Sequence, residues 1–334
     1  MVSVIIPVFN GERTIARAIE SVLAQRYDGA IEIVVVNDGS TDATASVLER
    51  YGSRLRAVTQ ENRGLAAARN AGVRASSGEL IAFLDADDEW FAEKLETVVG
   101  ALARQPHLAM VYSDAVQIDR AGNQIYDSYT PADQHRAPTL AEMLSGAWNI
   151  LPSSVLLRRE TFDEIGGFCE EFKALFFEDT WFYLLARERG SFAYLDKPLL
   201  RYERSNPAEG AVKRVTARGP DNPASRNQLE RSLRTFETMI ALTRGRYGAA
   251  ANGLITAVEQ RRLSFLEGTG LLRMQAGDPE AARRFYALAL RYARWNLKTR
   301  ARLLWTWLPD LARRALGAAL PARLHRSLAG PPKG

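Results

Sequence analysis

The chain has 334 residues, of which 46% are hydrophobic and 25% are charged. These proportions are ordinary for a globular protein and exclude a disordered or collagen-like chain, and the length allows one large core plus an accessory unit. With a single cysteine, Cys169, no intrachain disulfide can form, which fits a reducing compartment. We see no leader pattern and no apolar stretch near the roughly 20 residues of a membrane span, so we expect a cytoplasmic protein.

The net charge of +5 is distributed unevenly along the chain. Residues 291–334 hold ten Lys or Arg against one acid, Asp310, which gives this segment +9 and leaves −4 for the rest. A concentrated basic segment indicates an anionic partner, with membrane lipid and nucleic acid as the two candidates.

Short apolar runs alternate with helical patterns along the first 85 residues. In chain order we expect a strand at 2–6 ended by Pro7, a helix with Ile15, Ile19, Val22 and Leu23 at helical spacing, a β-branched strand at 31–36, a strand near 55–59, a helix from about Gly64 to Ala75, and a strand at 80–84. This alternation predicts an α/β fold, in which helices cover both faces of a mainly parallel sheet.

Later elements divide the rest of the chain. We expect a hairpin with its turn at 120–123, a strand near 153–158, a helix that begins at Glu178-Asp179, and a helix that begins with the N-cap Asp278 followed by Pro279. The Pro- and Gly-containing stretch 205–224 is predicted to be a linker. It separates an α/β domain at 1–204 from a helical, basic region at 225–334.

Polar clusters follow the predicted strands at Asn10–Glu12, Asp38–Ser40 and Asp85–Asp88. Ligands of parallel sheets bind at these carboxyl ends. In the third cluster, three carboxylates in four residues repel one another, and a divalent cation such as Mg²⁺ or Mn²⁺ that bridges to a diphosphate would offset this repulsion. The alternative is an acidic turn that caps a helix beginning near Phe91.

Other polar residues allow two interpretations each. Asp38 can accept from a nucleotide base or ribose, or belong to a turn in which Thr41 caps the next helix. Arg63 and Arg69 can meet phosphate or base at a helix N-terminus, or lie on the surface. The acids Glu178-Asp179, set among aromatic residues, can supply a general base or stabilise a helix N-terminus.

Together these residues closely resemble family 2 glycosyltransferases of the GT-A superfamily. The resemblance covers about residues 1–204 and is carried by the runs Val4–Asn10, Glu32–Asp42, Asn62–Asn70, Phe83–Asp88, Gly166–Phe168 and Glu178–Asp179. It implies a GT-A catalytic domain that uses a nucleotide diphosphate sugar donor and a carbohydrate or lipid-linked saccharide acceptor. The reaction class is typical of cell-surface polysaccharide or glycolipid synthesis.

The resemblance also implies roles for single residues. Asp85-Ala86-Asp87 matches the family's D-x-D motif, with Mn²⁺ or Mg²⁺ on Asp87 and with Asp88 as a substitute ligand. Asp179 matches the catalytic base of inverting members. The donor-binding positions implied are Pro7, Asn10, Glu12, Asp38, Arg63, Asp85, Ala86 and Asp87. Two positions depart from the family: Asn37 replaces a common Asp, and residues 202–205 lack the Tyr-Arg-x-His pattern, for which Arg204 can compensate.

Three rival functions are weaker. A nucleotidyltransferase would carry a Gly-rich phosphate loop with Lys or Arg near the N-terminus, which is missing. A processive polysaccharide synthase would carry Gln-x-x-Arg-Trp and membrane helices; here Arg291 stands in the Gln position before Arg294-Trp295. Nucleic-acid binding through the basic tail is opposed by the acidic clusters, which repel phosphate unless a metal intervenes, so we expect no nucleic-acid partner.

The tail at 291–334 also allows two interpretations. Its Leu, Trp and Arg residues are typical of a basic amphipathic element that lies on an anionic membrane, which would place the enzyme peripherally on the inner face of the cell membrane. The same Leu and Trp side chains can instead pack as a helical hairpin against the catalytic domain.

Overall fold

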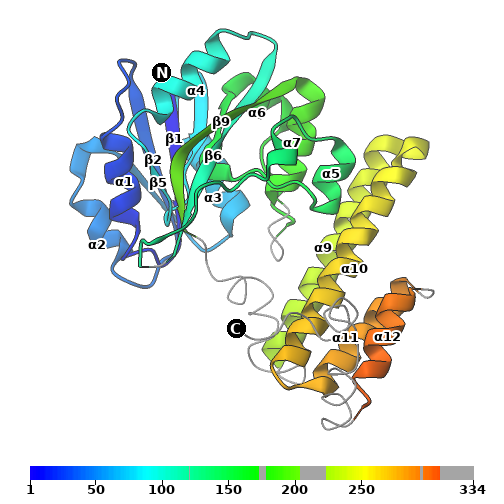
Figure 1. The fold of residues 1–334 in the computed structure, drawn as a ribbon. Coiled ribbons are helices and arrows are strands. Elements are labelled where there is room, and N and C mark those ends of the chain that lie inside the picture. Colours follow the sequence, from blue (N-terminus) through cyan, green and yellow to red (C-terminus); the bar gives the residue numbers. More distant parts are fainter. Residues whose placement is uncertain (120, 173–177, 204–222, 294–295, 309–334) are drawn as a thin grey trace. The chain divides into compact units, whose positions relative to one another are not determined.

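The computed structural model describes residues 1–119, 121–172, 178–203, 223–293 and 296–308. The chain divides into two compact units, Met1–Asn206 and Pro207–Gly334, which we describe separately (Figure 1). The predicted linker lies outside the described residues, apart from its last two positions, which begin a helix.

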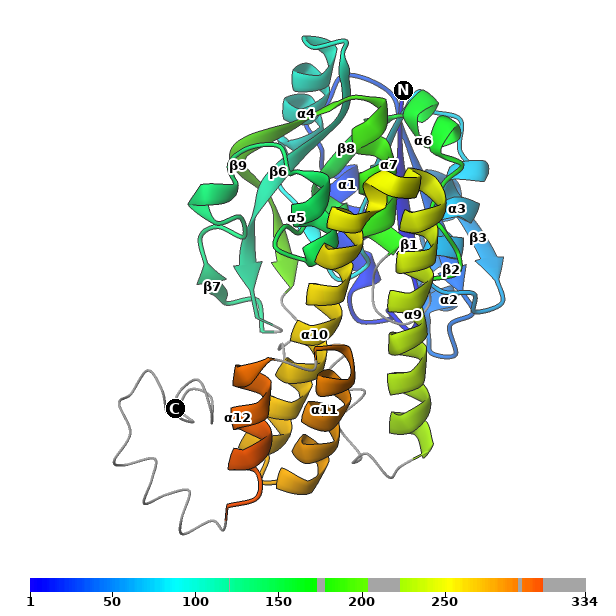
Figure 2. The ribbon, with the colours of Figure 1, turned by 90° about the vertical axis from the view of Figure 1, so that its right-hand side faces the viewer.

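Unit 1 is built on one curled sheet of nine described strands, in the order β3-β2-β1-β4-β8-β6-β9-β5, with β7 paired to β6 (Figures 1 and 2). Their bounds are β1 Val2–Val8, β2 Ile31–Asp38, β3 Arg56–Gln60, β4 Leu80–Phe83, β5 Glu89–Trp90, β6 Leu108–Ile118, β7 Gln124–Tyr126, β8 Val155–Arg158 and β9 Ser191–Glu203. The first four strands pair in parallel, as predicted. The later part is mixed, because β8 runs antiparallel to β4 and β6 while β9 runs parallel to β6.

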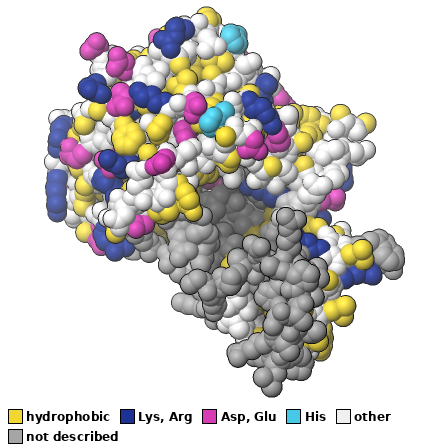
Figure 3. All heavy atoms as spheres, viewed as in Figure 1, with side chains coloured by type: hydrophobic (Ala, Val, Ile, Leu, Met, Phe, Trp, Pro, Cys, Tyr) yellow, Lys and Arg dark blue, Asp and Glu magenta, His cyan; other side chains and the backbone are white. Residues whose placement is uncertain are grey.

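Helices cover both faces of this sheet. They are α1 Ile15–Leu23, α2 Thr44–Glu49, α3 Leu65–Arg74, α4 Lys94–Ala103, α5 Leu140–Ser145, α6 Arg159–Ile165 and α7 Glu178–Arg189, with short 3-10 turns at Gly52–Arg54, Ala132–Gln134 and Pro152–Ser154. On the surface of this unit, acidic and basic side chains are interspersed in the view of Figure 3.

The alternation of side chains along β1 explains the two layers of the core. Val4 and Ile6 belong to the apolar cluster that includes Ile19 of α1. The intervening Ile5 faces α3, where Gly72 lies so close that a β-carbon would come within 2.3 Å of the Ile5 Cγ2 atom. Every residue of β1 is buried because both faces are covered.

Three local predictions need correction. The helix after the acidic cluster begins at Lys94 and not near Phe91, because the two-residue strand β5 intervenes and pairs with β9. Thr41 does not cap α2; the Asp42 Oδ1 atom instead accepts from the Thr44 N–H at 3.0 Å. Leu23, placed on the apolar face of the first helix, is 38% exposed.

Lys94 is fully buried at the start of α4. Its Nζ atom donates to the Ser154 carbonyl at 3.0 Å and lies 5.2 Å from the centre of the Trp90 ring. Burial disfavours the charged ammonium and lowers the pKa of Lys94 from 10.5 to about 7. Unit 1 therefore contains a core lysine that is largely neutral in mildly alkaline solution.

This buried lysine predicts a pH-dependent stability. Between pH 7 and pH 10.5 the unfolded chain holds the Lys94 proton and the folded chain releases it, so the free energy of unfolding should rise with pH. The slope approaches about 1.4 kcal/mol per pH unit for one proton. Urea unfolding across this window should show the rise for the wild type, and Lys94→Met should lose that contribution. As a control, Lys197→Met, at a half-exposed lysine, should keep the wild-type slope; equal slopes for all three proteins would contradict the prediction.

Unit 2 is helical in its described part. It comprises α9 Pro223–Tyr247, α10 Ala251–Gln275, α11 Pro279–Tyr292 and α12 Leu297–Trp305, with a short 3-10 turn at Gly248–Ala250. Leu266, Phe285 and Ala289 form a buried apolar cluster between α10 and α11. The predicted N-cap is confirmed, because the Asp278 side chain accepts from the Ala281 N–H ahead of Pro279. No helix among the described residues is long and apolar enough to cross a membrane.

Candidate active site

The loops that follow β1 and β2 are joined by side chains predicted to bind the donor. The Asn10 Oδ1 atom accepts from the Thr41 N–H at 2.8 Å, and the Asn10 N–H donates to the Ser40 hydroxyl at 2.9 Å. Asn10 takes a left-handed backbone conformation, with φ of +53°. The Glu12 carboxylate accepts from the Ala43 N–H at 2.9 Å. These contacts set the shape of the sheet edge on which the other predicted residues lie.

Asp38, at the end of β2, organises the loop before α3. One carboxylate oxygen accepts from the Gln60 side chain at 2.7 Å and from the Arg63 N–H at 2.9 Å, and the other accepts from the Gly64 N–H at 2.8 Å. The Asp38 side chain is therefore buried and already holds a backbone turn. The exposed Arg63 guanidinium pairs with Glu170 at 2.9 Å.

The acidic turn after β4 is held from two sides. The hydroxyl of Ser153 accepts from the Asp85 N–H at 2.9 Å and donates to the Asp88 carboxylate, whose other oxygen accepts from the Glu203 N–H at 3.1 Å. Asp88 is 2% exposed, and burial together with the charges of Asp87 and Asp85 raises its pKa well above the ordinary value. Both Asp88 carboxylate oxygens therefore accept hydrogen bonds from the protein, and these bonds fix the turn. The sequence did not indicate this role for Asp88 or for Ser153.

Asp87 is the exposed carboxylate of this turn. Arg17 of α1 donates to the Asp87 carbonyl at 2.6 Å and to the Glu203 carboxylate at 2.9 Å, which fixes the backbone beneath the Asp87 side chain. Desolvation by the surrounding protein atoms, and then repulsion from Asp85 and Glu203, raise the pKa of Asp87 to about 6. The carboxylate therefore lies in a crowded acidic position that a bound cation would relieve.

Arg69 links the acidic turn to the start of α7. Its guanidinium donates to Asp85 at 2.8 Å and to Glu178 at 3.1 Å, and it packs over the Phe168 ring at 5.3 Å. At 1% exposure Arg69 is not the surface residue that one sequence-based interpretation expected. The planar fork of an arginine suits this task, because it can meet two carboxylates at once.

Replacing Arg69 should therefore destabilise unit 1 strongly. Arg69→Met leaves two carboxylates, one of them buried, without their counter-charge, and breaking a buried ion pair costs about 3–5 kcal/mol. Arg69→Lys should recover only part of this, since an ammonium cannot bridge both partners. Urea unfolding measures the loss, with Arg74→Met on the exposed side of the same helix as the control. A free energy of unfolding for Arg69→Met equal to that of the control would rule out the bridge.

The acid pair at the start of α7 lies in the same electrostatic neighbourhood as the acidic turn. Burial, followed by the charge of Asp179, raises the pKa of Glu178 to about 7, and Asp85 also contributes. Burial and Asp179 likewise raise the pKa of Tyr183 on the next turn of the helix. Because Glu178 is buried and paired with Arg69, the half-buried Asp179 is the member of the pair that can face a ligand.

The carboxylates of the acidic turn suit a divalent cation whose remaining ligands come from the substrate. Among the residues that the structure describes, no three His, Cys, Asp or Glu side chains gather closely enough to hold a metal ion. Magnesium commonly binds through one or two carboxylates together with substrate phosphates. The exposed Asp87 and the part-exposed Asp85 fit this arrangement, because their oxygens are hard ligands at one edge of the sheet.

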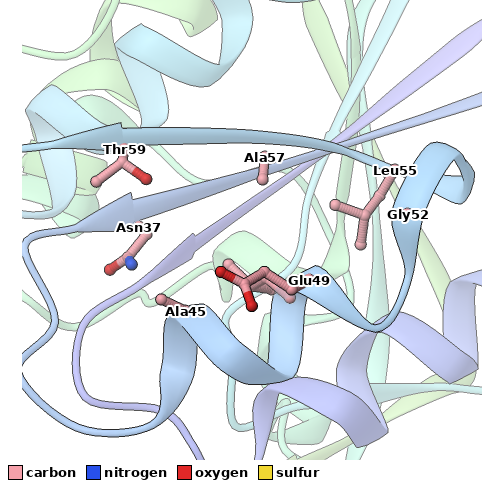
Figure 4. A pocket seen from close by; sticks show the side chains of 8 residues that line it. Asn37, Ala45, Glu49, Gly52, Leu55, Ala57 and Thr59 are labelled. Carbon is pink, nitrogen blue, oxygen red and sulfur yellow. The ribbon is translucent and has the colours of Figure 1, made fainter.

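A separate pocket of about 210 Å³ lies between α2 and the strands β2 and β3 (Figure 4). Its lining consists of Asn37, Ala45, Leu48, Glu49, Gly52, Leu55, Ala57 and Thr59. The residues predicted to bind the donor do not line it. The Asn37 side chain accepts from the Ser40 N–H at 2.9 Å, so this departure from the family's common Asp preserves the turn beside Asp38.

Comparisons with known proteins find relatives of this chain. The chain is 32% identical over 219 residues to an uncharacterized glycosyltransferase of Rickettsia typhi, covering 63% of this chain and 65% of that protein. It is 34% identical over 220 residues to an uncharacterized glycosyltransferase of Rickettsia felis, covering 64% of this chain and 35% of that protein. The matches thus span less than two thirds of the length of either relative.

Solved structures share the fold. The S. aureus protein TarS, residues 1–349 in complex with UDP-GlcNAc, has a TM-score of 0.60 at 21% identity, covering 91% of this chain and 86% of that one. The mannosyltransferase PcManGT of Pyrobaculum calidifontis, in complex with GDP-Man and Mn²⁺, has a TM-score of 0.56 at 22% identity. The match covers 98% of this chain and 82% of that one. The model of Glycosyl transferase family 2 matches residues 3–183, more than half of the chain. The chain therefore has a GT-A fold and belongs to glycosyltransferase family 2.

Proposed function

We propose that this enzyme transfers a sugar from a nucleotide diphosphate sugar to an acceptor hydroxyl with inversion at the anomeric carbon. The observation that carries the proposal is the Arg69 bridge, which joins the acidic turn to the start of α7. This bridge joins the turn that carries Asp85 and Asp87 to the helix start that carries Asp179, which supports a donor-side carboxylate group and an acceptor-side base acting together. The UDP-GlcNAc and GDP-Man complexes of the structural relatives support a nucleotide-sugar donor.

In the proposed reaction Asp179 takes the proton of the acceptor hydroxyl. The acceptor oxygen forms a bond to the anomeric carbon from the face opposite the diphosphate. The bond from that carbon to the diphosphate oxygen breaks, and the nucleoside diphosphate leaves with the electron pair. We assign this role to Asp179 because it is the less buried acid at the start of α7, whereas Glu178 is buried against Arg69.

We place the donor along the edge formed by the loops after β1, β2 and β4. The proposed contacts come from Pro7, Asn10, Glu12, Asp38, Arg63, Asp85, Ala86 and Asp87. Asp87, with Asp85 beside it, would hold Mn²⁺ or Mg²⁺, and such a cation stabilises the charge of a departing diphosphate as a Lewis acid. Asp88 supports this site by shaping the turn, since both its oxygens already accept hydrogen bonds.

The acceptor in this proposal is a carbohydrate or lipid-linked saccharide of cell-surface polysaccharide or glycolipid synthesis. An enzyme held peripherally on the inner face of the cell membrane would have access to a lipid-linked acceptor.

A panel of UDP-, GDP- and dTDP-sugars with Mn²⁺ tests the proposed reaction. Hydrolysis or transfer should release the nucleoside diphosphate from one donor class. A nucleotidyltransferase would instead form or consume pyrophosphate, and a processive synthase would elongate its product without releasing it. If no donor of the panel is bound or cleaved, or if pyrophosphate appears, the proposal is wrong.

A further inference from the structure

The helix α12 and the turn after it present large apolar side chains to solvent. Leu297, Leu304 and Trp307 are 78%, 69% and 67% exposed, the three highest values among the large hydrophobic residues described. They are seven and then three positions apart, so they lie along one side of the helix and its continuation. An exposed apolar group of this kind marks an interaction surface rather than a gap in the core.

The opposite side of α12 is anchored to unit 2 by polar contacts. Glu267 of α10 accepts from the Thr299 hydroxyl and from the Arg302 guanidinium, the latter at 3.1 Å. Thr299, Arg302 and Trp305 are all buried. The helix cannot roll to bury Leu304 without breaking the buried pair of Arg302 and Glu267, which would be costly. The apolar side is therefore held outward.

Basic residues accompany the exposed apolar ones. Arg300 is partly exposed on the same side of α12, and residues 297–308 contain no acid. Arg283 of α11 places its guanidinium 4.3 Å from the centre of the Trp307 ring. Figure 3 shows hydrophobic and basic side chains next to one another over α11 and α12. Apolar side chains among cations are the composition of helices that lie in the interface of an anionic bilayer.

We propose that the α12 face, defined as Leu297, Arg300, Leu304 and Trp307, docks on an anionic lipid surface. The apolar side chains enter the headgroup region, and the cations meet lipid phosphates. Within the tail, Trp305 and Arg302 are buried, whereas Leu304 and Trp307 are exposed and belong to the proposed surface. Residues 309–334 of the predicted membrane segment lie outside the described residues.

Vesicle sedimentation of the full-length protein tests this surface without requiring catalysis. The protein should bind vesicles of phosphatidylcholine with phosphatidylglycerol, bind pure phosphatidylcholine weakly, and be released as salt shortens the Debye length to about 3 Å at 1 M. The double variant Leu304→Ser/Trp307→Ser should bind roughly tenfold or more weakly. The matched control Ile125→Ser/Tyr126→Ser removes exposed apolar side chains from β7 and should bind like the wild type.

Other results would overturn the proposal. Equal binding of the two double variants, or no preference of the wild type for anionic vesicles, would show that the α12 face does not meet lipid. A concentration-dependent dimer that Leu304→Ser/Trp307→Ser abolishes would identify the face as a contact between two copies of the chain. Donor cleavage should be unchanged in both double variants, so failure here is distinguishable from failure of the proposed reaction.

Discussion

Replacing Asp179 with asparagine should lower the rate of sugar transfer about 10²–10⁴-fold, the usual cost of losing a general base. The amide keeps the size of the side chain and removes its basicity. The acceptor hydroxyl then loses its proton acceptor, while the nearby buried pair of Glu178 and Arg69 stays in place. Initial rates at saturating donor and acceptor measure the effect.

Two accompanying measurements separate a chemical effect from a structural one. Calorimetric binding of the nucleoside diphosphate should be unchanged in Asp179→Asn, since the proposed donor contacts lie on other loops. Asp163→Asn, at an exposed acid of α6, should keep wild-type turnover. Near-wild-type turnover of Asp179→Asn would refute the assignment, and an NMR spectrum showing retained anomeric configuration would refute inversion itself.

Replacing Asp87 with asparagine should reduce transfer by about 10²-fold or more, because Lewis-acid stabilisation of the leaving diphosphate supplies several kcal/mol. The loss should appear in binding as well as in rate. In the wild type, Mn²⁺ should tighten binding of the nucleoside diphosphate, whereas in Asp87→Asn it should not. Titration calorimetry with and without Mn²⁺ measures this directly, and a chelator should reproduce the variant's behaviour in the wild type.

The structure supplies matched controls for the acidic turn. Asp28→Asn alters an exposed acid just before β2, at the end of the sheet away from Asp38, and should leave both Mn²⁺ dependence and rate unchanged. Asp88→Asn should lower the stability of the protein, because it weakens the hydrogen bonds of this side chain with Ser153 and Glu203. Asp87→Asn should instead affect Mn²⁺ dependence and rate. Full transfer activity of the wild type in excess chelator would exclude the proposed metal.

Several features of the fold could be predicted from the sequence because they depend on neighbouring residues. The short apolar run at 2–6 and the β-branched run at 31–36 located the strands that became β1 and β2, and the cap at Asp278-Pro279 marked the start of α11. The family motifs identified the family and its fold through their order and spacing. The first four parallel strands then followed from the alternation of strand and helix.

Tertiary structure alone decided which charged side chains are buried and which face solvent. Arg69 is separated by 109 positions from Glu178, and Ser153 by 65 from Asp88, so no local pattern indicates either contact. The two-residue strand β5 was missed for the same reason, since it is stabilised by its pairing with β9 and by the hydrogen bonds of Trp90 to Ser21 and Ser153, all distant in the sequence. Likewise Trp305 and Trp307 lie two positions apart with similar chemistry, yet one is 6% and the other 67% exposed. Burial depends on what packs against a residue from elsewhere in the chain, and that information is absent from its sequence neighbours.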